Sequence, residues 1–191
     1  VALAMQHHVR VQVLSSFEDR PGTLVVDEDE IVETQIVSGI AYSRDEARIT
    51  VLGVKDRPGV AAAIFGPLSG SGINVDMIVQ SVSRDGEYAN LTFTVTRSDL
   101  PRALAVLERA NDDIRYERVV ADADVVKISI VGVGMRSHAG IAHQMFATLA
   151  AKGINIHAIA TSEIKVSVLI GEEYTELALR ALHTAYGLDK D

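Results

Sequence analysis

Two stretches of this chain repeat one another. RPGVAAAIFGPLSGSGINVDMIVQ begins at residue 57 and HAGIAHQMFATLAAKGINIHAIAT begins at residue 138, 81 residues later. In both, a glycine and a hydrophobic residue open an apolar run, and Gly-Ile-Asn closes it. Unrelated segments rarely agree over this length, so we expect two copies of one structural unit.

Each copy contains the pattern of an amphipathic helix. Apolar residues recur at the three- and four-residue spacing of a helix face that packs on a core. They are Val60, Ile64, Phe65 and Leu68 in the first copy, and Ile141, Met145, Phe146 and Leu149 in the second. Gly72 and Gly153 follow, and we expect the helices to end there because glycine readily adopts the left-handed conformation.

Strand patterns surround both helices. β-branched and alternating segments predict strands at 47–54, 73–82, 87–95 and 114–121 in the first copy, and at 125–133, 154–162 and 164–170 in the second. Each copy also has a second predicted helix, capped by Ser98 in the first and spanning 172–185 in the second. Strand-helix-strand-strand-helix-strand is the ferredoxin-like order, and only the first copy completes it.

The second copy lacks its last strand, and a sheet without that strand would keep an exposed edge. The strand-like segment 33–43, upstream of the first copy, fits the vacant place. We therefore predict an α+β fold of two ferredoxin-like βαββαβ domains, the first inserted into the second. The predicted domains are 45–122, and 33–44 with 123–191, after a separate segment 1–32.

Composition excludes several classes of partner. The 191 residues carry a net charge of −8 and a pI of about 5.2, which disfavours binding to nucleic acid or to an anionic membrane. The chain has no cysteine, so disulfides and thiolate metal sites are absent. No apolar stretch reaches the roughly 20 residues of a membrane span, and we expect a cytoplasmic location.

The repeated pattern resembles the ACT domain, a module that binds small amino acids as regulators. The segments that carry the resemblance are VSGIAYSRDEARITVLGVKDRPGVAAAIF, GINVDMIVQSVS, VVKISIVGVGMRSHAGIA and ATSEIKVSVLI. The region from about Ile36 onward is similar to the tandem ACT region of aspartate kinases, in which one ACT unit is inserted into the other. The resemblance therefore implies two ACT domains.

The N-terminal stretch VALAMQHHVRVQVLSSFEDRPGTLV resembles the end of an aspartate kinase catalytic domain. The chain as a whole is similar to the β subunit of an α2β2 aspartate kinase, which the family makes from an internal start. Val1 fits such a start codon, and a trimmed fragment of a full-length kinase is the alternative. Without the rest of its sheet, we expect segment 1–30 to pack poorly or to use a neighbour's edge.

By this resemblance, the chain is a regulatory subunit that binds threonine, lysine or both at ACT–ACT interfaces for feedback inhibition of aspartate phosphorylation. It is expected to have no catalysis and no cofactor of its own, while ATP and Mg²⁺ serve the associated kinase domain. The implied partners are a second copy of the chain and the catalytic α subunit. The alternative is a stand-alone ACT tandem that regulates another enzyme.

The helix starts offer backbone N–H groups for the carboxylate of an amino acid. These groups belong to Gly59, Val60 and Ala61 in the first copy, and to Gly140 and Ile141 in the second. Asp56 is able to accept a hydrogen bond from the ammonium group, or to cap the helix instead.

Polar side chains after each helix offer further contacts. Asn74 and Asn155 can donate and accept hydrogen bonds, or serve only as turn residues. Gln80 and Thr161 occupy matching positions at the constant offset of 81 residues and are candidates to line the pocket. Glu163 is a candidate partner of a lysine ammonium, or a solvated surface residue.

The resemblance implies that effector sites combine residues from two chains. One site would join Asp56, Gly59, Val60, Ala61 and Gln80 with Asn155 and Ile156 of another copy. The other would join Asn74 and Val75 with Met135, Ser137, Gly140, Thr161, Ser162 and Glu163. Because the second copy has no carboxylate at the place of Asp56, we expect the two sites to differ.

Motifs of independent catalysis are missing from the sequence. It contains no P-loop, no GxGxxG after a strand and no HExxH. The pairs Ser137-His138 and His7-His8 are adjacent, and adjacent side chains on a strand or helix point apart. We therefore expect a binding protein rather than an enzyme.

Overall fold

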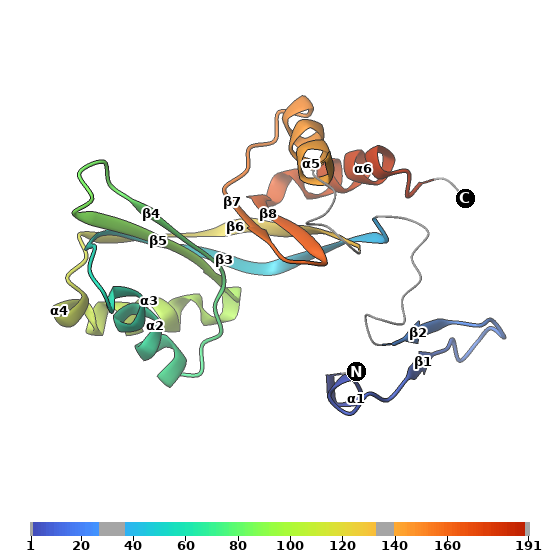
Figure 1. The fold of residues 1–191 in the computed structure, drawn as a ribbon, viewed down its shortest axis with the longest axis horizontal. Coiled ribbons are helices and arrows are strands. Elements are labelled where there is room, and N and C mark those ends of the chain that lie inside the picture. The colour runs from blue at the N-terminus through green and yellow to red at the C-terminus, as the bar shows by residue number, and fades with distance from the viewer. Residues whose placement is uncertain (1, 27–36, 133–139, 190–191) are drawn as a thin grey trace. The chain divides into compact units, whose positions relative to one another are not determined.

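The structure, a computed structural model, describes residues 2–26, 37–132 and 140–189 (Figure 1). The chain divides into two compact units, Val1–Gln35 and Ile36–Asp191. The larger unit contains both repeats.

The N-terminal unit is small and largely exposed. It comprises helix α1 (Ala2–Gln6) and a hairpin in which β1 (Val11–Val13) pairs with β2 (Thr23–Val25). Phe17 is 95% exposed, so the apolar side chains of this unit are poorly buried. This exposure agrees with the expected poor packing of segment 1–30, whereas its use of a neighbour's edge stays a prediction.

The C-terminal unit is built on one antiparallel sheet of six strands in the order β4-β5-β3-β6-β8-β7 (Figure 1). The strands are β3 (Gly39–Lys55), β4 (Asp76–Val82), β5 (Tyr88–Val95), β6 (Arg118–Val131), β7 (Ala158–Thr161) and β8 (Lys165–Gly171).

The two repeats share the central strands β3 and β6. The first repeat uses β4-β5-β3-β6 and the second uses β3-β6-β8-β7, so each has a four-stranded ferredoxin-like sheet. The start of β3, where Gly39 lies opposite Val131, completes the second repeat. The predicted α+β fold, with the first domain inserted into the second, is confirmed, whereas the exact domain boundaries stay a prediction.

The predicted division of β3 and of β6 into separate strands is wrong. Segments 33–43 and 47–54 were expected as two strands, but the described residues Gly39–Lys55 form one. Likewise, 114–121 and 125–133 merge into Arg118–Val131. Register shifts between Ser43 and Arg48 show that β-bulges, rather than a loop, accommodate the polar residues between the two predicted segments of β3.

Helices cover opposite faces of the sheet in the two repeats (Figure 1). The first repeat contributes α2 (Val60–Gly70), the 3-10 helix η2 (Arg97–Asp99), α3 (Leu100–Arg109) and α4 (Asn111–Ile114). The second contributes α5 (Gly140–Ala151), η3 (Glu172–Tyr174) and α6 (Thr175–Tyr186). Because side chains alternate along a strand, β6 serves both cores, with Val119 packing in the first and Ile128 in the second.

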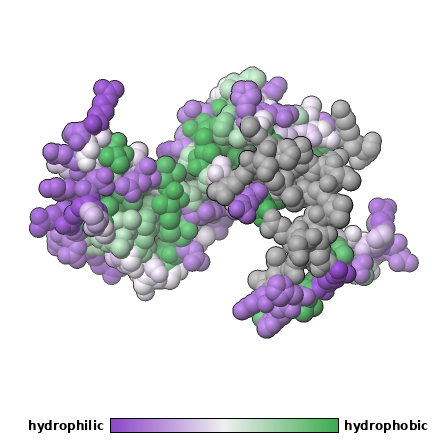
Figure 2. Space-filling model, in the orientation of Figure 1, coloured by the Kyte–Doolittle hydropathy of each residue, from purple (hydrophilic) through white to green (hydrophobic). Residues whose placement is uncertain are grey.

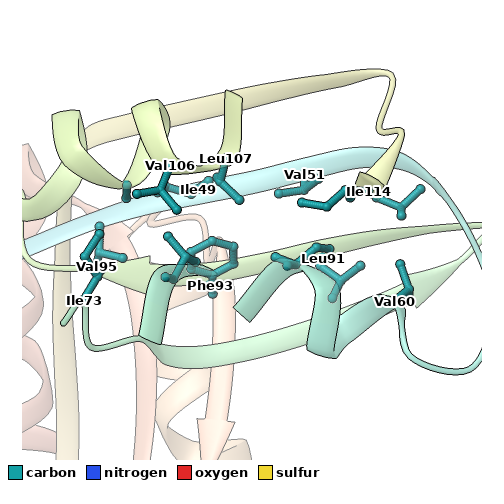
Figure 3. Close-up of a cluster of buried hydrophobic side chains, with 14 of the residues drawn as sticks. Ile49, Val51, Val60, Ile73, Leu91, Phe93, Val95, Val106, Leu107 and Ile114 are labelled. Atoms are coloured by element: carbon teal, nitrogen blue, oxygen red, sulfur yellow. The ribbon is translucent and has the colours of Figure 1, made fainter. Parts of the chain in front are cut away.

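Each repeat has its own apolar core. In the first, Phe93 of β5 is fully buried among side chains of β3, α2 and α3 (Figure 3). Its ring also packs edge-to-face on that of Phe65, with the ring centroids 5.1 Å apart. In the second, Met145 and Leu149 of α5 pack on β6, β8 and α6. The apolar stripes predicted from helical spacing therefore do line the cores.

The helix ends predicted at Gly72 and Gly153 are found in the structure, but the helix start predicted at Ser98 is not. Gly72 and Gly153 have φ values of 68° and 69°, so the predicted left-handed residues after α2 and α5 are confirmed. The expected Ser98 cap is wrong, because η2 inserts a tighter turn before α3. Thr96 caps that turn by accepting a hydrogen bond from the Asp99 N–H.

Candidate ligand-binding site

The start of α2 forms the first candidate cradle. Gly59 is its N-cap residue with φ 92°, and no side chain caps the helix. The Val60 N–H donates to the Arg57 carbonyl at 3.2 Å. The Val60 side chain is buried in the core, whereas Gly59 and Ala61 are exposed. The alternative role of Asp56 as a helix cap is thereby ruled out.

Asp56 instead pairs with Gln80, another candidate residue. Asp56 Oδ1 accepts a hydrogen bond from Gln80 Nε2 at 3.3 Å, and both side chains are exposed. The Asp56 N–H donates to the Glu87 carbonyl at 2.8 Å, which places Asp56 beside the turn of the β4–β5 hairpin. Gln80 lies opposite Leu91, a core residue, and therefore on the helix side of the sheet. A carboxylate and an amide thus lie together near an uncapped helix start.

Asn74 and Val75 follow the left-handed Gly72. The turn is closed by the Ile73 N–H, which donates to the Leu68 carbonyl at 3.0 Å. Val75 packs partly on the first core, whereas Asn74 is exposed. The same turn recurs in the second repeat, where the Ile154 N–H donates to the Leu149 carbonyl at 3.0 Å before the exposed Asn155.

The second cradle begins at Gly140, the first residue of α5. The candidates Met135 and Ser137 lie outside the described residues. Tyr186 at the end of α6 donates its hydroxyl to the Ile141 carbonyl at 2.7 Å, which ties α6 to the first turn of α5. Burial raises the pKa of Tyr186 to about 12, so this donor keeps its proton at neutral pH.

Thr161, Ser162 and Glu163 form the turn between β7 and β8. The Ser162 N–H donates to the Lys165 carbonyl at 2.8 Å, and the Lys165 N–H donates to Ser162 Oγ at 3.2 Å. The next residue, Ile164, accepts from the Gly132 N–H at 2.9 Å, which places the turn beside the end of β6. These three candidates therefore lie beside Gly132, the last described residue after β6.

Gln80 and Thr161 occupy matching places in the two hairpins. Gln80 lies opposite Leu91, which pairs with Val51 of β3, and Thr161 lies opposite Val166, which pairs with Ile130 of β6. Val51 precedes Leu-Gly-Val and Ile130 precedes Val-Gly-Val, so these are equivalent positions of the two repeats. The offset of 81 residues therefore holds at Gln80 and Thr161, and their role in lining a pocket stays a prediction.

Within one chain, the segment after Asn155 lies against the first repeat. A cavity of about 360 Å³ is lined by Val79, Thr92, Ile156, His157, Ala158 and Ile159. Ile156 and Val79, the neighbour of Gln80, therefore share one cavity. The resemblance implies that Gln80 and Ile156 meet between two copies, and that pairing stays a prediction.

Two residues near the candidate site were not anticipated, Met77 and Lys127. Met77 has a φ of 49°, which is unusual for a residue with a side chain, and it is buried. Lys127 forms ion pairs with Glu46 and Asp76. The one available signal was a charged lysine inside the largely apolar strand VVKISIV.

Other kinds of site are not found in the described part of the chain. It contains no cluster of three or more His, Asp or Glu side chains that could hold a metal ion. None of its helices combines the length and the apolar character needed to cross a membrane.

Comparison with known proteins identifies both repeats. Residues 48–112 and residues 128–186 each match an ACT domain family. The chain is 54% identical to the aspartate kinase of Pseudomonas fluorescens (strain SBW25) over 190 residues, which are 99% of this chain and 46% of that protein. The chain thus spans about half the length of the curated relatives it matches.

Solved structures show the same relationship. A structure of aspartokinase alpha and beta subunits aligns with 48% identity and a TM-score of 0.75, covering 79% of this chain and 99% of that one. The regulatory subunit of aspartate kinase from Thermus thermophilus aligns with 41% identity and a TM-score of 0.76, covering 80% and 99%.

Proposed function

Since the chain belongs to the aspartate kinase family and matches its two-ACT regulatory part, we propose that it binds the end-product amino acids threonine, lysine or both and thereby inhibits an aspartate kinase. The inhibited reaction is the ATP-dependent phosphorylation of aspartate. ATP and Mg²⁺ belong to the associated kinase domain, and this chain needs no cofactor.

The hydrogen-bonded pair of Asp56 and Gln80 beside the start of α2 carries this proposal. A free amino acid presents an ammonium and a carboxylate group. The carboxylate suits the N–H groups and the positive end of the helix dipole around Gly59–Ala61. The Asp56 carboxylate suits the ammonium group, while Gln80 holds Asp56 in place and still offers its own oxygen as an acceptor.

The second repeat supplies a cradle of different chemistry. It has Gly140 and Ile141 at the start of α5, and a turn with the polar residues Thr161, Ser162 and Glu163. Glu163 offers a charge for the side-chain ammonium of lysine. We propose that the two cradles differ in the amino acid they prefer, because only the first has a carboxylate at the position of Asp56.

The expected partners are a second copy of the chain and the catalytic subunit. Apolar side chains remain exposed on the strands of the C-terminal unit, including Ile78, Val82 and Ile159, and Figure 2 shows hydrophobic surface over this central region. Such a surface favours association of two copies through their ACT domains.

Effectors would bind between these copies, in the cytoplasm. A ligand of about eight heavy atoms, such as threonine, must use most of its polar groups to bind well, which favours an enclosed site at the interface.

Inhibition then follows from linkage. An effector that binds the inactive arrangement better than the active one shifts the enzyme toward inactivity, and a coupling of about 1–3 kcal/mol, or about 5–150-fold in affinity, suffices. The alternative, a stand-alone ACT tandem serving another enzyme, is less well supported, because similarity to aspartate kinases extends through the N-terminal unit.

Titration calorimetry on the full chain tests the proposal directly, with threonine, lysine, methionine and isoleucine as ligands. We expect saturable binding of threonine, lysine or both, and little binding of the other two. If the folded chain binds none of the four, the proposal fails.

Asp56→Ala should weaken effector binding about tenfold or more, because the ammonium group loses its charged partner. It should leave the melting temperature nearly unchanged, since Asp56 is exposed and caps no helix. Asp112→Ala, an exposed carboxylate on α4, is the matched control. Equal affinity of Asp56→Ala and the control would remove Asp56 from the site.

A further inference from the structure

Lys127 connects the two repeats by charge. Its ammonium group lies 2.5 Å from Glu46 Oε1 and 2.9 Å from Asp76 Oδ2. The Lys127 side chain is 18% exposed and that of Glu46 only 8%, whereas the Asp76 side chain is 56% exposed. Lys127 belongs to the part of β6 that builds the second repeat, while Asp76 opens β4 in the first. The ion pair with Asp76 therefore joins the repeats.

Asp76 also shapes the backbone beside it. Its Oδ1 accepts a hydrogen bond from the Met77 N–H at 2.8 Å, and Met77 has the left-handed φ of 49°. A non-glycine residue in this region costs of order 1 kcal/mol and persists only where its surroundings hold it. The holding groups are Asp76 on one side and the contacts of the Met77 side chain on the other.

The Met77 side chain is buried in the second repeat. It is 3% exposed and packs with Val125, Ala158 and Leu169, which lie on β6, β7 and β8. Ala158 in turn lies two residues after Ile156 and three after Asn155. The segments that follow the two Gly-Ile-Asn turns thus meet in one small apolar cluster, next to the ion pair of Lys127.

We propose that Lys127 is a positioning residue for the effector site to which Asn74 and Val75 contribute: by holding Asp76, it fixes these two residues in their binding conformation and ties them to the second repeat. This inference rests on the proposed function, because it assigns Lys127 a role in amino-acid binding. Lys127 itself need not touch the ligand.

The charges favour this arrangement. Burial opposes the charge on Lys127, but its hydrogen bonds to Glu46 and Asp76 outweigh burial and raise its pKa above the usual 10.5. Burial likewise opposes ionisation of Asp76, but the hydrogen bonds from Lys127 and the Met77 N–H lower its pKa below 3.8. Both groups are therefore charged at neutral pH, and replacing Asp76 by a neutral amide weakens the link without leaving a buried charge unpaired.

The test uses Asp76→Asn in the full chain, with Asp112→Asn as the matched control and Asp76→Glu as the conservative variant. Calorimetry measures the affinity for threonine and for lysine, and hydrogen–deuterium exchange follows amides 74–79. We expect Asp76→Asn to weaken binding about fivefold and to accelerate exchange in this segment, whereas Asp76→Glu should stay within about twofold of the wild type. Lys127→Met should give a loss that is not additive with that of Asp76→Asn.

Each outcome is decisive. If Lys127→Met does not fold, because Glu46 is left buried without its cation, Asp76→Asn alone decides. If the wild type binds and Asp76→Asn binds equally well, the positioning role is overturned while the proposed function stands. If losses from Asp76→Asn and Asp76→Glu are equal, the charge link is overturned. If the wild type binds neither amino acid, the proposed function fails, and the role of Lys127 fails with it whatever the exchange data show.

Discussion

A cavity in the first core should destabilise both repeats, because β3 and β6 run through both. The perturbation that tests this is Phe93→Ala. Phe93 is fully buried on β5, lies opposite Ile49 of β3 and packs edge-to-face on Phe65 at 5.1 Å with an interplanar angle of 73°. The substitution removes a large ring from the centre of one core only.

The expected loss is about 3–5 kcal/mol of unfolding free energy, as for other buried Phe-to-Ala changes. This loss corresponds to about two to four orders of magnitude in the equilibrium constant of unfolding, at roughly 1.4 kcal/mol per factor of ten. If the six-stranded sheet unfolds as one cooperative body, the full loss applies to strands of either repeat. The same substitution at Phe17, which is 95% exposed in the N-terminal unit, should change stability by less than about 0.5 kcal/mol.

Hydrogen–deuterium exchange resolved to β5 and β8 distinguishes the possibilities. β5 belongs to the first repeat and β8 to the second, and β8 pairs directly with β6. We expect amides of both strands to lose protection by the same factor, and urea unfolding followed by circular dichroism to remain a single transition. Wild-type protection of β8 alongside a large loss in β5 would refute the reasoning, because the shared strands would then not couple the cores.

Two further predictions concern titration. Tyr186 should ionise near pH 12 in the folded chain because burial raises its pKa, so Tyr186→Phe should remove the last step of a spectrophotometric titration at 295 nm; an unchanged titration curve would contradict this assignment. The lowered pKa of Asp76 means that its ionised form is stabilised by folding, so its contribution is present above pH 3.8 and is lost as pH falls below that value. The melting temperatures of wild type and Asp76→Asn should therefore differ at neutral pH and converge below pH 3.8, and a constant difference across this range would show that the carboxylate charge is irrelevant.

The candidate site shows which residue roles follow from sequence. Gly59 and Gly140 were placed correctly at helix starts, because apolar spacing marks where each helix begins. The hydrogen bond between Asp56 and Gln80 was not predictable, since it depends on how the β4–β5 hairpin pairs with β3. Met77 and Lys127 were missed for a similar reason, because their partners lie 48 or more residues away in the other repeat.

The sequence by itself determined the duplicated unit, its helix faces and the left-handed glycines at 72 and 153. These features are local, because periodicity and backbone freedom are properties of neighbouring residues. Only the tertiary structure decided that two strands run through both repeats, that helices cover opposite faces of one sheet, and that Asp56 bonds to Gln80 instead of capping α2. Strand pairing depends on bulges and on partners far along the chain, and a shift of one residue reverses every side chain, so local sequence patterns could not give these features.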